Sequence, residues 1–538
     1  MLLMRTLLAG FARRLTTNRR KGTPAVLSRT RTLLRLEVLE ARTLPSTFYV
    51  STAGNDRNDG RTSATAWQTI AKVDRTTFQA GDVVLFQGGD VFQGNLRFSS
   101  GGTATAPITL SSYGTGRAAI EAGAGSGLAV HNAGGFQISN LNFVGTGNTS
   151  ANGISFDNAL PGNVKLPHVY IDHVDIRGFG ANGIDMLGDI GTDGYDDVRI
   201  TYVTSHGNGL AGVYIEGQVP RASNSRVYIG HCQAYNDNLG GLEIADTNGG
   251  TIERSTAHDN AAGLGHEVGI WTYDSNNITI QYNESYRNFS VSGSDEGDGF
   301  DFDGGTTNSI MQYNYSHEND GAGILLGEYP GAGLTGGNLI RYNISQNDGR
   351  LNGYAGIFLY NYDYPYSKVT NNYIYNNTVY NSVGSAAVVI SGSLPASSNV
   401  FANNIFQTAG GVPLILDESQ SGATFVGNDY WTSGGAFVIR YHGARITSLA
   451  AFHAAGQETL NGKLTGYNID PKLQNPGKGG TIGNADNLGT LSAYLLNSTS
   501  GLLNTGLNLK SLFGVSSGQR NFFGKLIPLN GPFDIGAD

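Results

Sequence analysis

The sequence predicts an all-β solenoid, and two observations predict it. From about residue 136 to 440 one pattern recurs every 23–34 residues: a short apolar strand, a turn, a second short strand, a loop rich in Gly and Asn, and a third strand that follows a Gly. The composition agrees, because 78 of the 538 residues are Gly and only 14% are charged. Self-similarity at a regular spacing marks a solenoid, and period-2 alternation without intervening helices marks a solenoid of strands.

One position of the repeat is asparagine in six consecutive copies. It follows a tyrosine in segments such as ITIQYNESYRN (278–288) and IMQYNYSHEN (310–319). The six residues are Asn283, Asn314, Asn343, Asn377, Asn404 and Asn428. Stacked strands lie about 4.8 Å apart, so a buried Asn at a tight turn can satisfy its amide through the Asn above, the Asn below and the turn backbone. The sequence therefore predicts an asparagine ladder.

This ladder, at the turn between the second and third strands, resembles that of the right-handed parallel β-helices related to pectate lyases. The resemblance implies a single right-handed parallel β-helix with an N-terminal cap and a carbohydrate-active function. The segment TFYVSTAGNDRNDG (47–60) is similar to the opening that precedes many carbohydrate-active β-helices, and GDVVLFQGGDVFQG (81–94) is similar to their first rung. Three residues after the ladder, His206, His258 and His317 share a position with tyrosines, which predicts stacked rings rather than a metal site.

The pattern divides the chain into four parts. They are a basic leader (1–46), an N-terminal cap with the first rung (47–100), the β-helix (101–445) and a C-terminal capping segment (446–538). Two short helical patterns are expected, TIAKVDRTTF (69–78) and SLAAFHAAGQE (448–458). The first should cover the apolar end of the solenoid, because an open β edge promotes aggregation.

Charge is divided unevenly between the leader and the rest of the chain. Residues 1–44 hold ten Lys or Arg and two acidic residues, whereas the remainder holds 24 basic and 41 acidic residues. An acidic body excludes nucleic acid as a partner, and no apolar run reaches the roughly 18 residues of a membrane span. The segment LEVLEARTLPS (36–46) resembles the LEPR-XLL motif of large exported bacterial surface proteins, with Ala41 in place of the proline. We expect a monomer that is secreted or held at the cell surface.

The strand after the repeat's Gly supplies a candidate binding face. Alternation directs the residue after Gly, and the one two further on, into the core, and the others toward solvent. The outward set is Asp185, Leu187, Tyr214, Glu216, Glu243, Ala245, Trp271, Tyr273, Asp301, Asp303, Leu325, Phe358 and Tyr360. Successive exposed aromatic residues indicate a partner, and aromatic faces with carboxylates suit sugar rings. Trp271, Tyr273, Tyr214, Glu216, Phe358 and Tyr360 are therefore predicted to bind a polysaccharide. The alternative is that long loops bury this stripe.

Carboxylates on this face suit acid–base chemistry. Residues 295–303 contain five acidic side chains. Asp301 and Asp303 lie roughly 6.6–6.8 Å apart at Cα, and Glu243 lies two rungs from Asp301, roughly 9.6 Å. Either pair can reach the roughly 5–9.5 Å separation of glycosidase carboxylates, and crowding should raise one pKa while its neighbour stays ionised. We predict Asp301, Asp303 and Glu243 as catalytic, with His266 as a proton-transfer partner.

The same acidic run has an alternative use as a calcium site. Asp295, Glu296, Asp298 and Asp301 offer hard oxygen ligands on a Gly-rich loop and strand. DGFDFD (298–303) resembles the acidic run of family 9 pectate lyases, and this resemblance implies that Asp298 and Asp301 bind calcium. That family places a catalytic lysine on the neighbouring rung, whereas GIWTYD (269–274) contains none.

The sequence thus favours an exported polysaccharide hydrolase whose paired carboxylates lie in an aromatic cleft. A calcium-dependent lyase or epimerase of uronic-acid polymers is the first alternative, and a non-catalytic glycan-binding or adhesive β-helix is the second. Calcium is the one cofactor considered, and no organic cofactor is expected.

Overall fold

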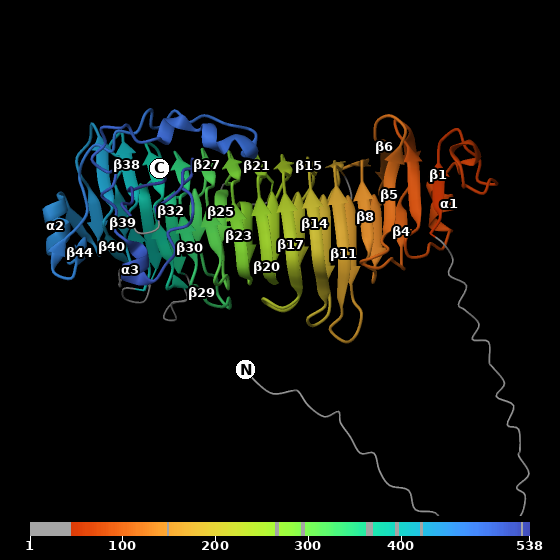
Figure 1. The fold of residues 1–538 in the computed structure, drawn as a ribbon, viewed down its shortest axis with the longest axis horizontal. Helices are drawn as coiled ribbons and strands as arrows, with labels where there is room; N and C mark the ends of the chain where they lie inside the picture. The colour runs from red at the N-terminus through yellow and green to blue at the C-terminus, as the bar shows by residue number, and fades with distance from the viewer. Residues whose placement is uncertain are drawn as a thin grey trace, which may run out of the picture. The chain divides into compact units, whose positions relative to one another are not determined.

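The computed structural model describes residues 45–147, 150–263, 268–291, 296–361, 369–392, 398–419, 423–528 and 531–538. Within residues 45–538 the chain winds through three long sheets whose strands stack as rungs along one axis (Figure 1). The predicted all-β parallel solenoid is confirmed. The leader lies outside the described residues, so export stays a prediction.

Each full rung contributes one strand to each sheet, and we name the sheets A, B and C in chain order. Sheet A consists of β1 (Thr47–Val50), β2 (Val83–Gln87), β5 (Ile108–Tyr113), β8 (Phe136–Ser139), β11 (Lys165–Asp172), β14 (Gly194–Thr201), β17 (Asn224–Gly230), β20 (Thr247–Glu253), β23 (Asn276–Gln281), β26 (Ile310–Gln312), β30 (Leu339–Arg341), β34 (Tyr373–Tyr375), β37 (Val400–Ala402) and β40 (Thr424–Val426).

Sheet B is one strand shorter. It consists of β3 (Val91–Gln93), β6 (Ala118–Gly123), β9 (Leu141–Gly145), β12 (Asp175–Arg177), β15 (Thr204–His206), β18 (Gln233–Tyr235), β21 (Thr256–His258), β24 (Glu284–Tyr286), β27 (Tyr315–His317), β31 (Ile344–Gln346), β35 (Thr378–Asn381), β38 (Ile405–Ala409) and β41 (Asp429–Ser433).

Sheet C carries the strands that follow the repeat's Gly. It consists of β4 (Leu96–Phe98), β7 (Leu128–His131), β10 (Ile154–Asn158), β13 (Ile184–Gly188), β16 (Val213–Glu216), β19 (Leu242–Ala245), β22 (Val268–Tyr273), β25 (Asp298–Phe302), β28 (Ile324–Leu326), β32 (Ala355–Asn361), β36 (Ala386–Gly392), β39 (Ile415–Asp417), β42 (Ile439–Tyr441) and β43 (Ala444–Ile446). All pairs within the three sheets are parallel except β42 with β43. Two small pairs join β29 (Thr335–Gly336) to β33 (Val369–Thr370) and β44 (Thr459–Leu460) to β45 (Lys463–Leu464).

The core lies inside the rungs. Alternation predicted that the residue after each Gly faces inward, and Ile184, Val213, Ile270 and Phe300 are all fully buried. The inward residues of all three sheets pack into one continuous apolar column. Stacking these rungs is what buries the column, so the repeat specifies the fold.

The predicted asparagine ladder is confirmed. The backbone N–H and Nδ2 of Asn283 both donate to Oδ1 of Asn314, at 3.0 and 3.1 Å, and each later Asn does the same with its successor as far as Asn428. The ladder ends on Glu458, whose Oε1 accepts from Nδ2 of Asn428 at 2.9 Å. Each buried amide therefore keeps its hydrogen bonds.

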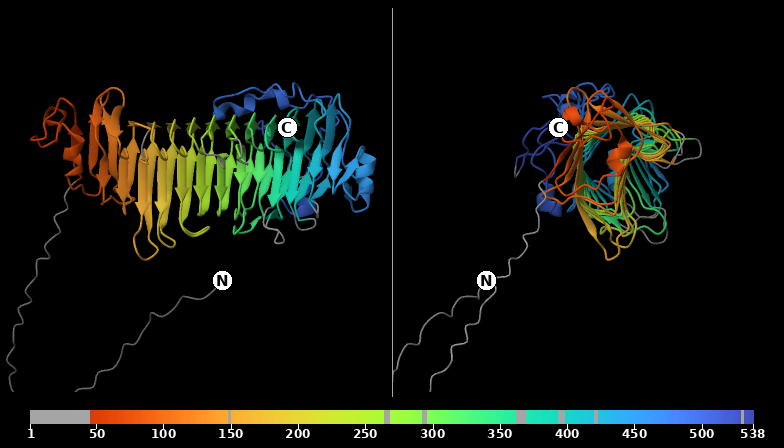
Figure 2. Two further views of the ribbon diagram at one scale, coloured as in Figure 1. Left: turned by 180° about the vertical axis from the view of Figure 1, so that it is seen from behind. Right: turned by 90° about the vertical axis from the view of Figure 1, so that its right-hand side faces the viewer.

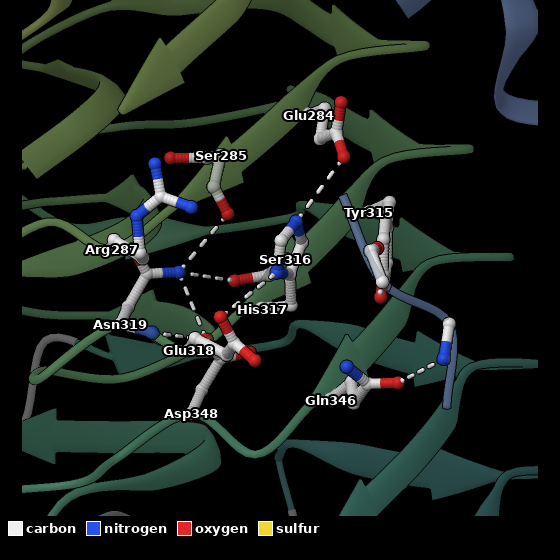
Figure 3. A network of polar contacts seen from close by, with 12 residues as sticks. Glu284, Ser285, Arg287, Tyr315, Ser316, His317, Glu318, Asn319, Gln346 and Asp348 are labelled. Carbon is white, nitrogen blue, oxygen red and sulfur yellow. Dashed lines mark hydrogen bonds and ion pairs between the residues drawn. The ribbon is translucent and has the colours of Figure 1, made fainter. Parts of the chain in front are cut away.

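A second polar ladder runs along the turn that follows sheet B. Its members are Asn208, Asp237, Asn260, Asn288, Asn319 and Asp348. Figure 3 shows Asn319, whose Nδ2 donates to Oδ1 of Asp348 at 2.9 Å and to the carbonyl of Ser285 at 3.1 Å. This ladder fixes the loops that lead into sheet C.

Rings stack along the outer face of sheet B, as predicted. His206, Tyr235, His258, Tyr286 and His317 follow one another with centroids 4.6–5.1 Å apart. The last ring, His317, is fully buried, and its Nε2 lies 3.2 Å from Oε1 of Glu284 (Figure 3). The rings serve packing.

Short helices cover both ends, as predicted. Helix α1 (Ile70–Asp74) places Ile70 and Val73 in the core column, and α2 (Leu449–Ala454) places Phe452 there. The remaining helices are α3 (Leu509–Phe513) and the 3₁₀ turns η1 (Ser63–Thr65), η2 (Ala485–Thr490) and η3 (Ser492–Tyr494). No helix among the described residues is long and apolar enough to cross a membrane.

The C-terminal segment does more than cap the far end. After α2 the chain runs back along the solenoid and covers the outer face of sheet B, as the blue trace shows in Figures 1 and 2. The backbone N–H of Gly479 donates to Gln346 at 2.7 Å, and that of Ile482 donates to Glu284 at 2.6 Å. Asp486 reaches Arg254 at 2.9 Å. The predicted stripe lies on sheet C, a different face from the outer face of sheet B that this segment covers.

Candidate functional site

The outward side of sheet C aligns the predicted residues in two rows. Parallel register makes Tyr214, Glu243, Trp271, Asp301, Leu325 and Phe358 neighbours on successive rungs. Two positions further along each strand stand Glu216, Ala245, Tyr273, Asp303 and Tyr360. Asp303 directly follows β25, and its N–H donates to the carbonyl of Thr272 at 3.0 Å, so it keeps the strand register.

The expectation that this stripe faces solvent is wrong for part of it. Asp301 is 1% exposed and Glu243 is 2% exposed, while Leu325, Asp185 and Ala245 are also buried. Their strand positions direct these side chains away from the core, yet neighbouring residues leave them almost no exposed surface. Tyr214, Tyr273, Glu216, Asp303, Phe358 and Tyr360 stay half-buried. The stripe is therefore a partly covered groove.

Two cavities form this groove. The first, which we call the Trp271 cavity, measures about 300 Å³ and is lined by Tyr214, Glu243, Trp271, Tyr273, Asp303 and Tyr329. The second, the Phe358 cavity, measures about 390 Å³, and its walls include Glu296, Asp303, Glu328, Tyr329, Tyr354, Phe358 and Tyr360. Asp303 and Tyr329 belong to both, so the cavities adjoin.

The aromatic wall of the Trp271 cavity is held in place by polar contacts. The Tyr273 hydroxyl donates to Oε1 of Glu216 at 2.7 Å, and the rings of Trp271 and Tyr273 lie 5.4 Å apart at 33°. Burial, together with the Glu243 carboxylate, raises the pKa of both the Tyr214 and Tyr273 hydroxyls. These phenols therefore stay protonated and serve as hydrogen-bond donors.

Asp303 has the properties of a general acid. Burial raises its pKa from 3.8 to about 6; the N–H of Gly304 opposes this, and the carboxylates of Asp274 and Glu328 add to it. It is half-buried and lines both cavities. A carboxyl group that keeps its proton close to neutral pH and meets open space can deliver that proton to a ligand.

Behind this wall, two neighbouring residues hold buried polar atoms without partners. Within the part of the chain that the structure describes, Nε1 of Trp271 and Oδ1 of Asp301 make no hydrogen bond. Burial raises the pKa of Asp301 well above its ordinary value, and Asp303 adds to the effect. Unpaired buried polar groups are costly, and Trp271 is the one of these two residues that also lines a cavity.

The predicted calcium ligands do not come together among the described residues. Asp298 and Asp301 are three positions apart on β25, and side chains an odd number of positions apart on a strand project to opposite faces. Asp298 instead accepts a hydrogen bond from the N–H of Ala322. In residues 45–538, apart from the gaps named above, no group of three His, Cys, Asp or Glu could hold a metal ion. Asp295 and His266 lie outside the described residues, and calcium stays a prediction.

The structure adds residues that the repeat pattern did not indicate. Glu328, Tyr329 and Tyr354 line the Phe358 cavity, and the Tyr329 hydroxyl donates to Oδ2 of Asp274 at 3.2 Å. Glu328 is 1% exposed. The signal in the sequence was the acidic and aromatic pair directly after GILLG (323–327). Glu296, predicted as a metal ligand, lies in this cavity wall.

The fold and the groove define the class of protein. Residues 182–335 match the family model described as "Right handed beta helix region". That match covers most of the rungs that carry the groove. The predicted right-handed parallel β-helix is thus confirmed.

Two known proteins extend the comparison. A curated lacto-N-biosidase from Bifidobacterium longum subsp. longum is 36% identical over 143 residues, which are 26% of this chain and 8% of that protein. Among solved structures, the GH136 lacto-N-biosidase from Eubacterium ramulus superposes with a TM-score of 0.52 as the selenomethionine derivative, at 18% identity, over 71% of this chain and 67% of that one. Its native form gives a TM-score of 0.50 at 17% identity, over 71% and 68% of the two chains. The structural likeness concerns the fold.

Proposed function

We propose that this protein is a glycoside hydrolase and that its groove on sheet C is the active site. The observation that carries the proposal is Asp303, a half-buried carboxyl with a pKa of about 6 that lines two adjoining cavities. The 36% identity to a lacto-N-biosidase over 143 residues supports it independently. A groove with several carboxylates suits a neutral glycan, because an anionic one would need compensating charge.

Asp303 supplies the proton in this mechanism. Cleavage of a glycosidic bond needs an acid that protonates the leaving oxygen and a carboxylate that attacks or activates water. The acid role suits Asp303 because its raised pKa keeps the proton available up to about pH 6. The low dielectric of the groove strengthens both interactions.

The second carboxylate is Glu243 or Glu296, one on each side of Asp303. Glu243 shares the Trp271 cavity with it, and Glu296 shares the Phe358 cavity. We place the reaction in the Trp271 cavity, because Tyr214, Trp271 and Tyr273 provide aromatic walls there and the N–H of Trp271 still needs an acceptor. A sugar ring offers apolar C–H faces to such walls and hydroxyls to the N–H. Glu243 is then the second catalytic residue.

Four variants test this assignment. Asp303→Asn, Glu243→Gln and Glu296→Gln are compared with Asp470→Asn, an exposed acid outside the groove. Substrates are an oligosaccharide that carries a lacto-N-biose unit on a sugar leaving group, which the relative's name suggests, and a panel of plant and algal polysaccharides. We expect Asp303→Asn and Glu243→Gln to lose at least 1,000-fold in kcat/KM and Glu296→Gln less than tenfold.

Chemical rescue then separates the roles. Azide should restore turnover of an activated aryl glycoside to a Glu243→Ala variant, since it replaces the missing carboxylate. Full loss in Glu296→Gln with activity kept in Glu243→Gln would move the reaction to the Phe358 cavity. Wild-type protein that cleaves no glycan in the panel, or Asp303→Asn with full activity, would contradict the proposal.

A further inference from the structure

A further cavity lies away from the groove. It measures about 690 Å³ and opens between sheet A and the returning C-terminal segment. Gln281, Gln312 and Arg341 form its floor at one strand position on consecutive rungs. Residues 514 and 516–520, with Lys510, form the opposite wall. We call it the Arg341 cavity.

Its charge is opposite to that of the protein. The whole chain carries a formal net charge of −9, yet the titratable groups of this lining are Arg341, Lys510, Arg520 and two tyrosines, with no Asp or Glu. Some arginines elsewhere are paired with acids, as Arg287 is with Asp259 at 2.7 Å and Arg254 with Asp486 at 2.9 Å. Among the described residues Arg341, Lys510 and Arg520 make no ion pair, so this cavity gathers three such cations in an acidic protein.

Arg341 is the central group of this cavity. It is 7% exposed, and among the described residues no carboxylate oxygen lies within 4.0 Å of its nitrogens. Its Nε donates to Oε1 of Gln312 at 2.9 Å, and its Nη1 donates to the carbonyl of Ser516 at 2.6 Å. These partners are neutral. A buried cation with neutral partners retains a strong preference for an anion.

The nearest acid along the floor is remote. Hydrogen bonds run from Arg341 to Gln312, from Gln312 to Gln281 at 2.8 Å, and from Gln281 to Glu253 at 2.7 Å. Glu253 therefore lies three rungs from Arg341, about 14 Å at the usual strand spacing. It orients the amides but does not neutralise the guanidinium at the other end.

The remaining walls suit an organic anion. The amide nitrogens of Gln281 and Gln312 each use one N–H in the row of hydrogen bonds that leads to Glu253, and each carries a second N–H. Tyr282 and Tyr313, whose rings stack with centroids 4.8 Å apart, also line the cavity. The volume lies within the roughly 300–1,000 Å³ of pockets that hold organic ligands, far above the size of an inorganic ion.

We propose that the Arg341 cavity is a second, non-catalytic binding site for an anionic sugar, one that carries a carboxylate or sulfate group. The choice of a sugar rests on the proposed function, whereas the preference for an anion rests on Arg341, Lys510 and Arg520 alone. The site would hold a charged branch or neighbouring polymer while the groove on sheet C acts on its substrate.

Calorimetric titration of the full chain tests this site without turnover. The probes are an oligogalacturonate, its neutral methyl ester, a sulfated oligosaccharide and inorganic sulfate. We expect wild type to bind at least one anionic oligosaccharide, more than tenfold tighter than the ester or sulfate. Lys510→Glu should weaken this binding at least tenfold, and Lys463→Glu, an equal charge change at an exposed site elsewhere, should weaken it less than twofold.

Further variants keep the result independent of folding and of the groove. Arg341→Gln should abolish binding, with Tm measured alongside because Arg341 also bonds the C-terminal segment. Asp303→Asn should bind as wild type does, even where it cleaves nothing. Unchanged affinity in Lys510→Glu, equal binding of the neutral ester, or no binding of either anionic oligosaccharide would overturn the proposal. Sulfate bound as tightly as the sugars would overturn the assignment to a sugar.

Discussion

Trp271 and Asp301 are register partners on β22 and β25, and each holds a buried polar atom that lacks a hydrogen bond. One atom is a donor and the other an acceptor. They lie on adjacent rungs, and Trp271 lines the same cavity as Asp303. Under the proposed function, a hydroxyl of the substrate could accept from the N–H of Trp271 and donate to Oδ1 of Asp301.

Trp271→Phe tests the donor. The substitution keeps an aromatic wall and removes an N–H that has no partner in the free protein. We expect Tm to fall by no more than a few degrees and KM to rise about fivefold, because one hydrogen bond to ligand is worth about 1 kcal/mol. Kinetics and thermal melts measure both. An unchanged KM would show that the N–H does not meet the substrate.

The pH dependence of hydrolysis tests Asp303. Its raised pKa means that the acid form persists to about pH 6 and ionises above it. We expect kcat/KM to fall about tenfold per pH unit above this value. With an activated aryl leaving group, which needs no proton, Asp303→Asn should retain activity and lose this alkaline limb. A limb that survives the substitution belongs to another group.

Stability should fall as pH rises through the neutral range. Burial raises the pKa of Asp237 from 3.8 to about 8, against the opposing hydrogen bonds from Asn208. The folded state then binds a proton that the unfolded state has lost, so its stabilising effect is full below pH 3.8 and is lost as pH rises toward 8. Asp237→Asn, which matches its ladder neighbours, should raise Tm at pH 8.5 and leave it unchanged at pH 4. Equal shifts at both values would contradict this.

Interrupting the asparagine ladder should be costly. Asn343→Ala removes the acceptor for two N–H groups of Asn314 and the donor to Asn377. Each buried group left unsatisfied costs about 1–3 kcal/mol, so we expect a loss of about 2–4 kcal/mol in the free energy of unfolding. Asn487→Ala, at an exposed position, should cost less than about 0.5 kcal/mol. Denaturant titrations compare the two.

Chelation separates hydrolysis from calcium-dependent elimination. We expect EDTA to leave cleavage unchanged and the products to be reducing sugars without the absorbance of an unsaturated uronate. Loss of activity in EDTA that calcium restores, together with that absorbance, would favour a lyase and a calcium site that includes Asp295.

The fold was predictable because its signal repeats. The ladder position is Asn in six consecutive copies, and each copy forms the same turn. The second ladder was missed because it alternates Asn208 and Asn260 with Asp237, which mixes two residue types in loops of uneven length. Its members occupy equivalent positions in the fold but are not all the same residue type.

For the site, the sequence predicted the direction of the side chains on sheet C but not their burial. Period-2 alternation identified the rows that contain Glu243, Trp271 and Asp301, since side-chain direction is a local property of a strand. Which of them are buried did not follow from alternation, because burial depends on contacts with residues of other segments, such as Tyr329, which lines the Trp271 cavity. Glu328 was missed for the same reason.

The returning C-terminal segment changes how this solenoid is completed. A stack in which each rung touches only its neighbours can form step by step from the first rung onward. Here Glu284 receives backbone N–H groups from residues 482 and 483, about two hundred positions later in the chain. During synthesis the middle rungs therefore lack these hydrogen bonds until residues 482 and 483 have been made. The last part of the chain then completes rungs whose own residues were made much earlier.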